Sequence, residues 1–184
     1  MNQRSYAIAF HKQAEADFAT HLRLRGGGYP DCHSLHYMQM ACEKLAKSWL
    51  ASRRRVDPND LKTHRLIKQT FHVVILEYCR RGAVSAHSRR EWMSTKLNQI
   101  AGEVERLSPS VEGPGFDPRP ENCEYPWSSE EGGNWIAPVD YAFPNLVALC
   151  GPPLPYNPSK AAGAEFTKLV QFALRTLKVE LEGA

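Results

Sequence analysis

The stretch from Tyr29 to Arg55 constrains the fold of this chain more than any other, because it has the pattern of one long amphipathic helix. Its apolar residues recur at steps of three and four, at Leu35, Met38, Cys42, Leu45 and Trp49. On an α-helix this spacing gathers all five on one stripe. Glu43 and Lys47 lie four residues apart on a neighbouring face, in the favourable order for an ion pair. The stretch therefore predicts a helix that buries one face against partner helices.

Four further segments repeat this pattern. Their stripes are Tyr6, Phe10, Ala14, Phe18 and Leu22; His64, Ile67, Phe71, Val74 and Tyr78; Met93, Leu97, Ile100, Val104 and Leu107; and Phe166, Val170, Ala173, Leu177 and Leu181. Gly- and Pro-rich turns interrupt the segments, and such residues punctuate helices. Because each stripe needs a partner and short connections favour antiparallel neighbours, the sequence predicts an all-α antiparallel bundle of about five helices.

Residues 111–158 depart from this pattern. Ten of the 13 prolines lie between Pro114 and Pro158, too densely for a helix of ordinary length. The segment still contains the aromatic residues Phe116, Tyr125, Trp127, Trp135, Tyr141 and Phe143, and disordered chains avoid aromatics. We expect an ordered insertion, within a single domain spanning residues 1–184, that packs its aromatics on the bundle. Residues 124–127 and 135–139 can pair as a short β-hairpin around the turn at 128–133.

Cysteine usage and hydropathy predict a cytoplasmic protein without membrane contact. The five cysteines are scattered, odd in number and form no Cys-x-x-Cys pair. This argues for a reducing compartment and against a disulfide scaffold or a thiolate zinc site. No run of about 18 apolar residues is present, so we expect no membrane-spanning helix. The N-terminus is polar throughout and does not have the pattern of a signal peptide.

Charge is unevenly distributed along the chain. Residues 1–110 contain 18 Lys and Arg against 10 Asp and Glu, whereas residues 111–184 contain 5 against 10. A basic first part is compatible with a polyanionic partner such as RNA. The alternative is that the acidic part folds back on the basic part. The sequence alone leaves both interpretations open.

The segment from Ala41 to Leu50, A-C-E-K-L-A-K-S-W-L, resembles the second helix of HEPN domains. There an Ala-x-Glu-Lys-x-x-Lys core follows a Tyr-Pro-like turn. The resemblance covers the first three predicted helices and the last one, and it is best at residues 16–22, 29–50 and 63–66. It implies a helical bundle that commonly forms a homodimer. Many HEPN proteins are metal-independent ribonucleases in toxin–antitoxin, CRISPR or other defence systems, and others are inactive partners of nucleotidyltransferases.

The resemblance also implies candidate catalytic residues. Active HEPN proteins carry an Arg and a His a few residues apart, usually with a polar residue after the Arg and often a Tyr two residues after the His. Here five residues separate Arg81 from His87, and Arg80 satisfies the looser spacing. Such a His would transfer a proton near the 2′-hydroxyl or the leaving oxygen. The Arg would stabilise the charge that develops on the phosphorus.

Two departures from that pattern weaken the catalytic interpretation. Gly82 follows the Arg, and Arg89 stands where the Tyr is expected. A similar spacing also joins Arg4 to His11 inside the first predicted helix. We therefore favour a non-catalytic HEPN-like module that binds RNA, a nucleotide or a protein partner, such as a cognate nucleotidyltransferase or antitoxin. The alternative is a metal-independent endoribonuclease that uses Arg81 and His87.

Two other groups of residues are candidates for binding sites. Three basic clusters can contact phosphates, although the helix dipole alone also favours arginines at helix C-termini. They are Arg53, Arg54 and Arg55; Arg80 and Arg81; and Arg89 and Arg90. Cys32 and His36 lie four residues apart on one helical face and form an incomplete zinc-ligand pair. Because no full ligand set is visible, we expect no metal and no cofactor.

Overall fold

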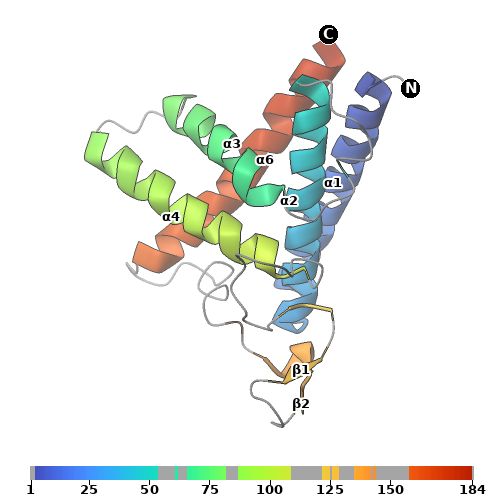
Figure 1. Ribbon diagram of the computed structural model, residues 1–184. Coiled ribbons are helices and arrows are strands. Elements are labelled where there is room, and N and C mark those ends of the chain that lie inside the picture. Colours follow the sequence, from blue (N-terminus) through green and yellow to red (C-terminus); the bar gives the residue numbers. More distant parts are fainter. Residues whose placement is uncertain are drawn as a thin grey trace.

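The computed structural model places the helical core of the chain and short parts of the insertion (Figure 1). The described residues are 3–53, 61, 66–81, 87–108, 122–124, 126–128, 135–141, 143 and 158–183, without the side chains of residues 3, 75, 78–94, 127, 128 and 158–165. Five α-helices lie within these ranges. The predicted all-α bundle is confirmed.

Helices α1 (Gln3–Gly26) and α2 (Asp31–Arg53) form an antiparallel pair and lie side by side in Figure 1. The turn between them favours glycine at Gly28, which has a φ of 70°. A Cβ on Gly27 would lie 2.8 Å from the exposed Tyr29 ring, which would have to move. Farther along the pair, the Ser48 hydroxyl donates a 2.7 Å hydrogen bond to the Ala7 carbonyl oxygen. The two helices are therefore in contact along most of their length.

Helices α3 (Ile67–Arg81) and α4 (His87–Arg106) run in opposite directions and pack on α6 (Pro158–Gly183). The Phe71 and Phe166 rings stack at 5.7 Å and join α3 to α6. Glu105 of α4 accepts a 2.9 Å hydrogen bond from the backbone N–H of Lys68. This satisfies one of the N–H groups that the first turn of α3 leaves without a helical partner.

The core consists largely of the predicted apolar stripes. All five stripe residues of α2 and all five of α6 are buried, as are Leu97, Ile100, Val104 and Leu107. The stripe predicted for α1 is wrong at its end, because Leu22 is 39% exposed. Its members were spaced by four throughout, and each such step drifts by about 40° around a helix. The buried face of α1 instead follows Ala7, His11, Ala14, Phe18 and His21.

The insertion contains the predicted hairpin, in a shifted position. Strand β1 (Trp127–Ser128) pairs antiparallel with β2 (Trp135–Ile136), so that Ser128 belongs to a strand and not to the turn. The second strand ends early, because Pro138 lacks a backbone N–H and begins the short 3-10 helix η2 (Pro138–Asp140). Phe143 is buried as expected, but Trp135 is 75% exposed. The expectation that the aromatics pack on the bundle is thus wrong for Trp135.

Several predicted features lie outside the described residues. They are His64, Arg54, Arg55, Gly82 and most of the insertion, together with the side chains of Tyr78 and Met93. Among the helices that are described, none has the length and apolar character needed to cross a membrane.

Candidate functional site

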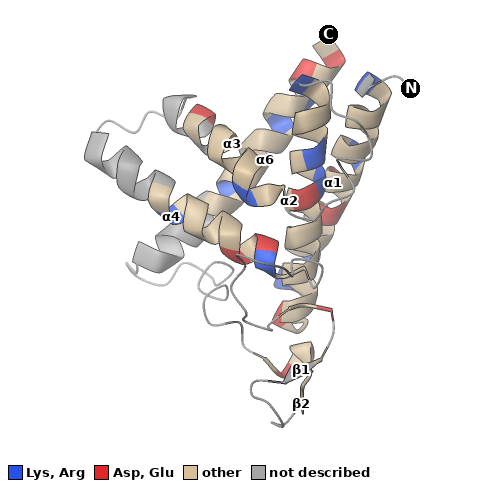
Figure 2. Cartoon of the chain, in the orientation of Figure 1, with Lys and Arg blue, Asp and Glu red and all other residues tan. Residues whose placement is uncertain are grey.

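The charged residues of the described helices are mixed by sign. Figure 2 shows Lys and Arg interspersed with Asp and Glu along α1, α2 and α6. Among the described residues, three charged contacts join residues 1–110 to residues 111–184. Arg53 pairs with Glu180 at 2.8 Å, His36 lies 3.6 Å from Glu124, and Lys178 lies 3.8 Å from Glu15. These contacts favour the interpretation in which the acidic part folds back on the basic part.

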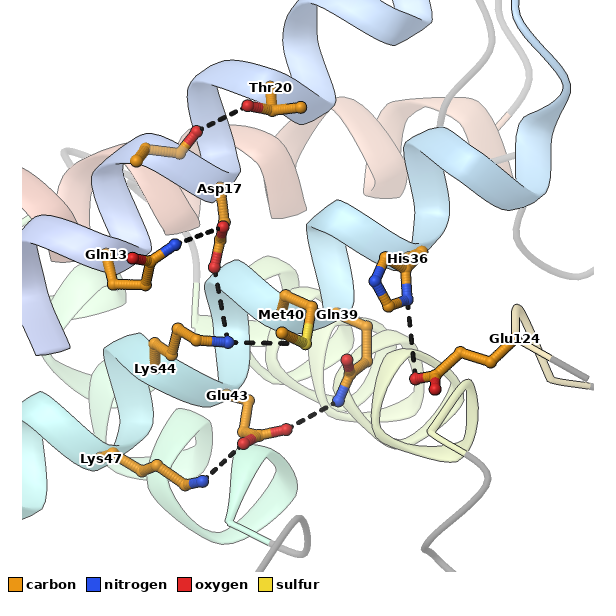
Figure 3. Close-up of polar contacts among 11 residues, drawn as sticks. Gln13, Asp17, Thr20, His36, Gln39, Met40, Glu43, Lys44, Lys47 and Glu124 are labelled. Carbon is orange, nitrogen blue, oxygen red and sulfur yellow. Dashed lines mark hydrogen bonds and ion pairs between the residues drawn. The ribbon is translucent and has the colours of Figure 1, made fainter.

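A buried ion pair lies on α2 (Figure 3). Lys47 pairs with Glu43 one turn away, and their side chains are 8% and 4% exposed. Gln39 donates a 3.1 Å hydrogen bond to the other carboxylate oxygen of Glu43. The Lys47 ammonium also lies 5.8 Å from the centre of the Phe10 ring on α1. The predicted Glu43–Lys47 pair is thus confirmed, but it lies in the packed interior of the molecule.

A second ion pair joins α2 to α1. The Lys44 ammonium lies 3.5 Å from Asp17, whose other carboxylate oxygen accepts a 2.9 Å hydrogen bond from Gln13. Lys44 also contacts the Met40 sulfur at 3.5 Å. All three charged residues of the Glu-Lys-x-x-Lys segment therefore have a partner on α1 or α2. In this structure the segment stabilises the packing of the two helices.

The candidate catalytic residues flank the connection between α3 and α4. Arg81 is the last residue of α3, and His87 is the first residue of α4. Arg80 precedes Arg81, while Arg89 and Arg90 lie in the first turn of α4. The fold therefore places the five residues at the adjoining ends of two consecutive helices, whereas their side chains lie outside the described part of the structure.

Arg4 and His11, which share the Arg–His spacing, both have structural roles. Arg4 donates a 2.9 Å hydrogen bond to the carbonyl oxygen of Leu181. His11 is buried, and its Nε2 donates a 2.8 Å hydrogen bond to the carbonyl oxygen of Leu174. Both residues thus hold α1 against α6. Their Arg–His spacing is therefore a coincidence of the helix sequence and does not mark a catalytic pair.

Arg53 is the described member of the first basic cluster. Its guanidinium lies 4.2 Å from the centre of the Trp49 ring. The same group donates two hydrogen bonds, of 2.8 and 2.9 Å, to the Glu180 carboxylate. The Glu180 carboxylate compensates the charge of Arg53, which makes Arg53 a weaker phosphate ligand. Its guanidinium instead presents a planar surface on which another ring can stack. The spacing of four between Trp49 and Arg53 is the sequence signal for this contact.

Cys32 and His36 do not form a metal-binding pair in the structure. Cys32 is 1% exposed, and burial raises the pKa of its thiol, which disfavours the thiolate that a metal needs. His36 turns its Nδ1 toward Glu124 (Figure 3). Among the residues that the structure describes, no three His, Cys, Asp or Glu side chains lie together as a metal site.

The apolar pattern missed a buried histidine on α1. His21 is fully buried, and its Nδ1 donates a 2.8 Å hydrogen bond to the carbonyl oxygen of Ser34 on α2. Burial lowers the pKa of His21, the positive charge of Arg25 lowers it further, and the Ser34 carbonyl opposes both. His21 is thus a neutral core residue. His21 lies three residues after Phe18, which lies four residues after Ala14. This helical spacing is the sequence signal that places His21 on the buried face.

Comparisons with known proteins identify no relative. No protein-family model matches the chain, and no curated protein or solved structure matches it.

Proposed function

We propose that this chain is a non-catalytic HEPN-like module that binds RNA through the adjoining ends of α3 and α4. The observation that carries the proposal is the position of Arg80 and Arg81 in the last turn of α3 and of Arg89 and Arg90 in the first turn of α4. Four arginines within eleven residues form an electrostatic footprint for a polyanion.

The helix dipole supports this proposal. The N-terminus of a helix carries a partial positive charge, which disfavours cations and favours anions. The first turn of α4 contains Arg89 and Arg90 and no acidic residue. The two arginines therefore add to the positive end of the helix, where a phosphate group would be stabilised. Arginines at this position lower the stability of α4 but favour the binding of an anionic ligand.

Binding of a labelled single-stranded RNA, followed by fluorescence anisotropy, tests the proposal. The double variant Arg89→Glu/Arg90→Glu should bind more weakly, and its salt dependence should fall by about 0.7 for each phosphate that is no longer neutralised. The control Lys12→Glu/Arg23→Glu changes the net charge equally at two exposed positions of α1. If both double variants bind with the same reduced affinity, the α3–α4 end is not the binding site.

The alternative function is a metal-independent endoribonuclease. It is favoured by the location of Arg81 and His87 at the two sides of one inter-helix connection. In a homodimer with α3 or residues 80–90 near the two-fold axis, two such pairs would share one cleft. A nucleotidyltransferase or antitoxin is the expected partner in a toxin–antitoxin or defence setting, and a nucleotide is the expected alternative to RNA as the ligand.

A further inference from the structure

A groove lies between the last turns of α2 and the first turns of α3. It encloses about 280 Å³ and is lined by Trp49, Leu50, Arg53, Gln69, Thr70 and Val73. Pockets for drug-sized ligands measure roughly 300–1,000 Å³. The groove is thus large enough for one flat ring system and too small for a whole dinucleotide cofactor.

Arg53 provides a fixed planar surface in this groove. One face of its guanidinium covers the Trp49 ring at 4.2 Å, and Glu180 holds its edge through two hydrogen bonds. The Arg53 side chain is still 46% exposed. Unpaired RNA bases stack on arginine guanidinium planes as well as on aromatic rings. The ion pair with Glu180 orients the guanidinium plane, and the exposed part of the side chain is available to a stacked base.

A polar amide accompanies this stacking surface. Thr70 is 4% exposed, and its hydroxyl oxygen is closed off from solvent, so Thr70 belongs to the wall of the groove and offers no contact to a ligand. Gln69 is exposed beside it and carries both an amide donor and an amide acceptor. Val73, which is 50% exposed, adds an apolar side.

We propose that this groove binds an unpaired adenine base of RNA, stacked on the Arg53 guanidinium. Adenine presents a donor and an acceptor side by side at N6 and N7, the pattern that a Gln amide matches with two hydrogen bonds. Gln69 supplies that amide beside the guanidinium plane of Arg53. The inference rests on the proposed RNA-binding function and adds a base-recognition site to the phosphate-binding α3–α4 end.

Adenosine, which has no phosphate, tests the groove separately from that end. In ¹H–¹⁵N NMR spectra of the full chain, adenosine should shift the Trp49 indole and Gln69 amide signals in a saturable manner. Arg53→Lys keeps the charge and can still pair with Glu180 but lacks the planar face. Its affinity for adenosine should be about tenfold lower, the usual scale for one stacked base.

Two further variants complete the test. Gln69→Leu removes the exposed amide and should also weaken adenosine binding. Arg23→Lys, at an exposed position of α1, should leave it unchanged. Equal affinity of the wild type and Arg53→Lys, with both folded, would overturn the inference.

The remaining outcomes separate this inference from the proposed function. If the wild type binds RNA but adenosine moves neither signal, the base site is wrong and the RNA-binding module stands. If adenosine binds in the groove and RNA binds equally to the wild type and to Arg89→Glu/Arg90→Glu, the base site stands and the α3–α4 proposal fails. If both signals move with protein concentration alone, a second copy of the chain occupies the groove and the inference is overturned.

Discussion

Lys47 and Glu43 form an ion pair one turn apart on α2, and the exposed fractions of their side chains are 8% and 4%. Taking two charges out of water is costly, and their attraction offsets that cost only with additional hydrogen bonds. Gln39 supplies one such bond. Lys44 and Asp17 form a second pair between α2 and α1. Glu43, Lys47 and Gln39 all belong to α2, so the Lys44–Asp17 pair is the one of these polar contacts that joins the two helices.

Breaking the buried pair should destabilise the protein strongly. Glu43→Ala should lower the free energy of unfolding by about 3–5 kcal/mol, because it leaves the Lys47 charge buried without its partner. The double variant Glu43→Leu/Lys47→Met should be close to the wild type or more stable. Urea titration measures both. Glu180→Ala breaks the exposed pair with Arg53 and should cost about 0–1 kcal/mol; a similar cost for Glu43→Ala would mean that the pair is solvated.

Trp49 should be among the most stabilising residues of α2. It is 5% exposed at the end of the apolar stripe, and Arg53 covers its ring. Trp49→Ala should cost about 3–5 kcal/mol, the usual range for a buried aromatic residue. The matched control is Trp135→Ala, because Trp135 is 75% exposed and should change stability by about 0.5 kcal/mol or less. A loss under about 1 kcal/mol for Trp49→Ala in denaturant titration would contradict the packing of α2.

The fold could be predicted from the sequence where apolar spacing reports burial directly. On α2 and α6 the mixed steps of three and four keep the stripe on one face, and every predicted member is buried. On α1 the predicted stripe uses only steps of four, so its last residue lies away from the buried face of the helix. His11 and His21 also lie on that face, but a pattern that counts only apolar residues does not include them. Their burial depends on carbonyl groups of α6 and α2, which no local rule supplies.

The candidate sites were predictable to a smaller extent. The Glu43–Lys47 spacing predicts an ion pair, but burial of that pair depends on segments far away in the chain. Trp49 and Arg53 lie four apart on one helix, so their contact could have been read from the sequence. Their groove could not, since Gln69 and Thr70 come from the next helix and carry no signal of their own. Tertiary packing, and not local pattern, creates that site.

Protonation of His21 should make the protein less stable in mild acid. Burial lowers the pKa of His21 in the folded state, whereas the unfolded chain has the ordinary value of about 6.5. As the pH falls below that value, the unfolded state binds more protons, so the free energy of unfolding falls. The contribution of His21 is present above about pH 6.5 and is lost as the pH falls below that value, with a limiting slope of about 1.4 kcal/mol per pH unit.

Urea titrations between pH 5 and 7 check this dependence. His21→Asn removes the titrating group and should flatten the dependence of stability on pH, whatever its effect on stability at pH 7. His33→Asn changes an exposed histidine and should keep the wild-type slope. An unchanged slope in His21→Asn would show that another group causes the acid sensitivity.

A homodimer should form through α3 or the adjoining end of α4. Leu76 of α3 is 41% exposed and lies one turn from Val73, which is 50% exposed, so a partner chain would bury apolar surface there. Light scattering at micromolar concentration should give the mass of two chains. Leu76→Glu should shift the mass toward one chain, while Val179→Glu, at the 70% exposed Val179 of α6, should not. A monomeric wild type would remove the dimer and with it the composite catalytic cleft.

If the protein cleaves RNA, the reaction should persist in EDTA and leave a 2′,3′-cyclic phosphate. The 2′-hydroxyl beside the phosphate is an internal nucleophile and needs no metal-bound water. His87→Ala should abolish cleavage, because it removes the proton-transfer group. Arg81→Ala should slow it about a hundredfold or more, the scale of losing one charge-stabilising group. Gel analysis of single- and double-stranded substrates, with mapping of the product ends, measures each effect.

The controls for cleavage follow from the structure. Lys96→Ala changes an exposed basic residue of α4 and should cleave at the wild-type rate. Arg4→Ala and His11→Ala share the Arg–His spacing, but these side chains hold α1 on α6. Their variants should be less stable and yet equally active per folded molecule. If His87→Ala cleaves as fast as the wild type, catalysis by this pair is excluded and the RNA-binding proposal has to stand without it.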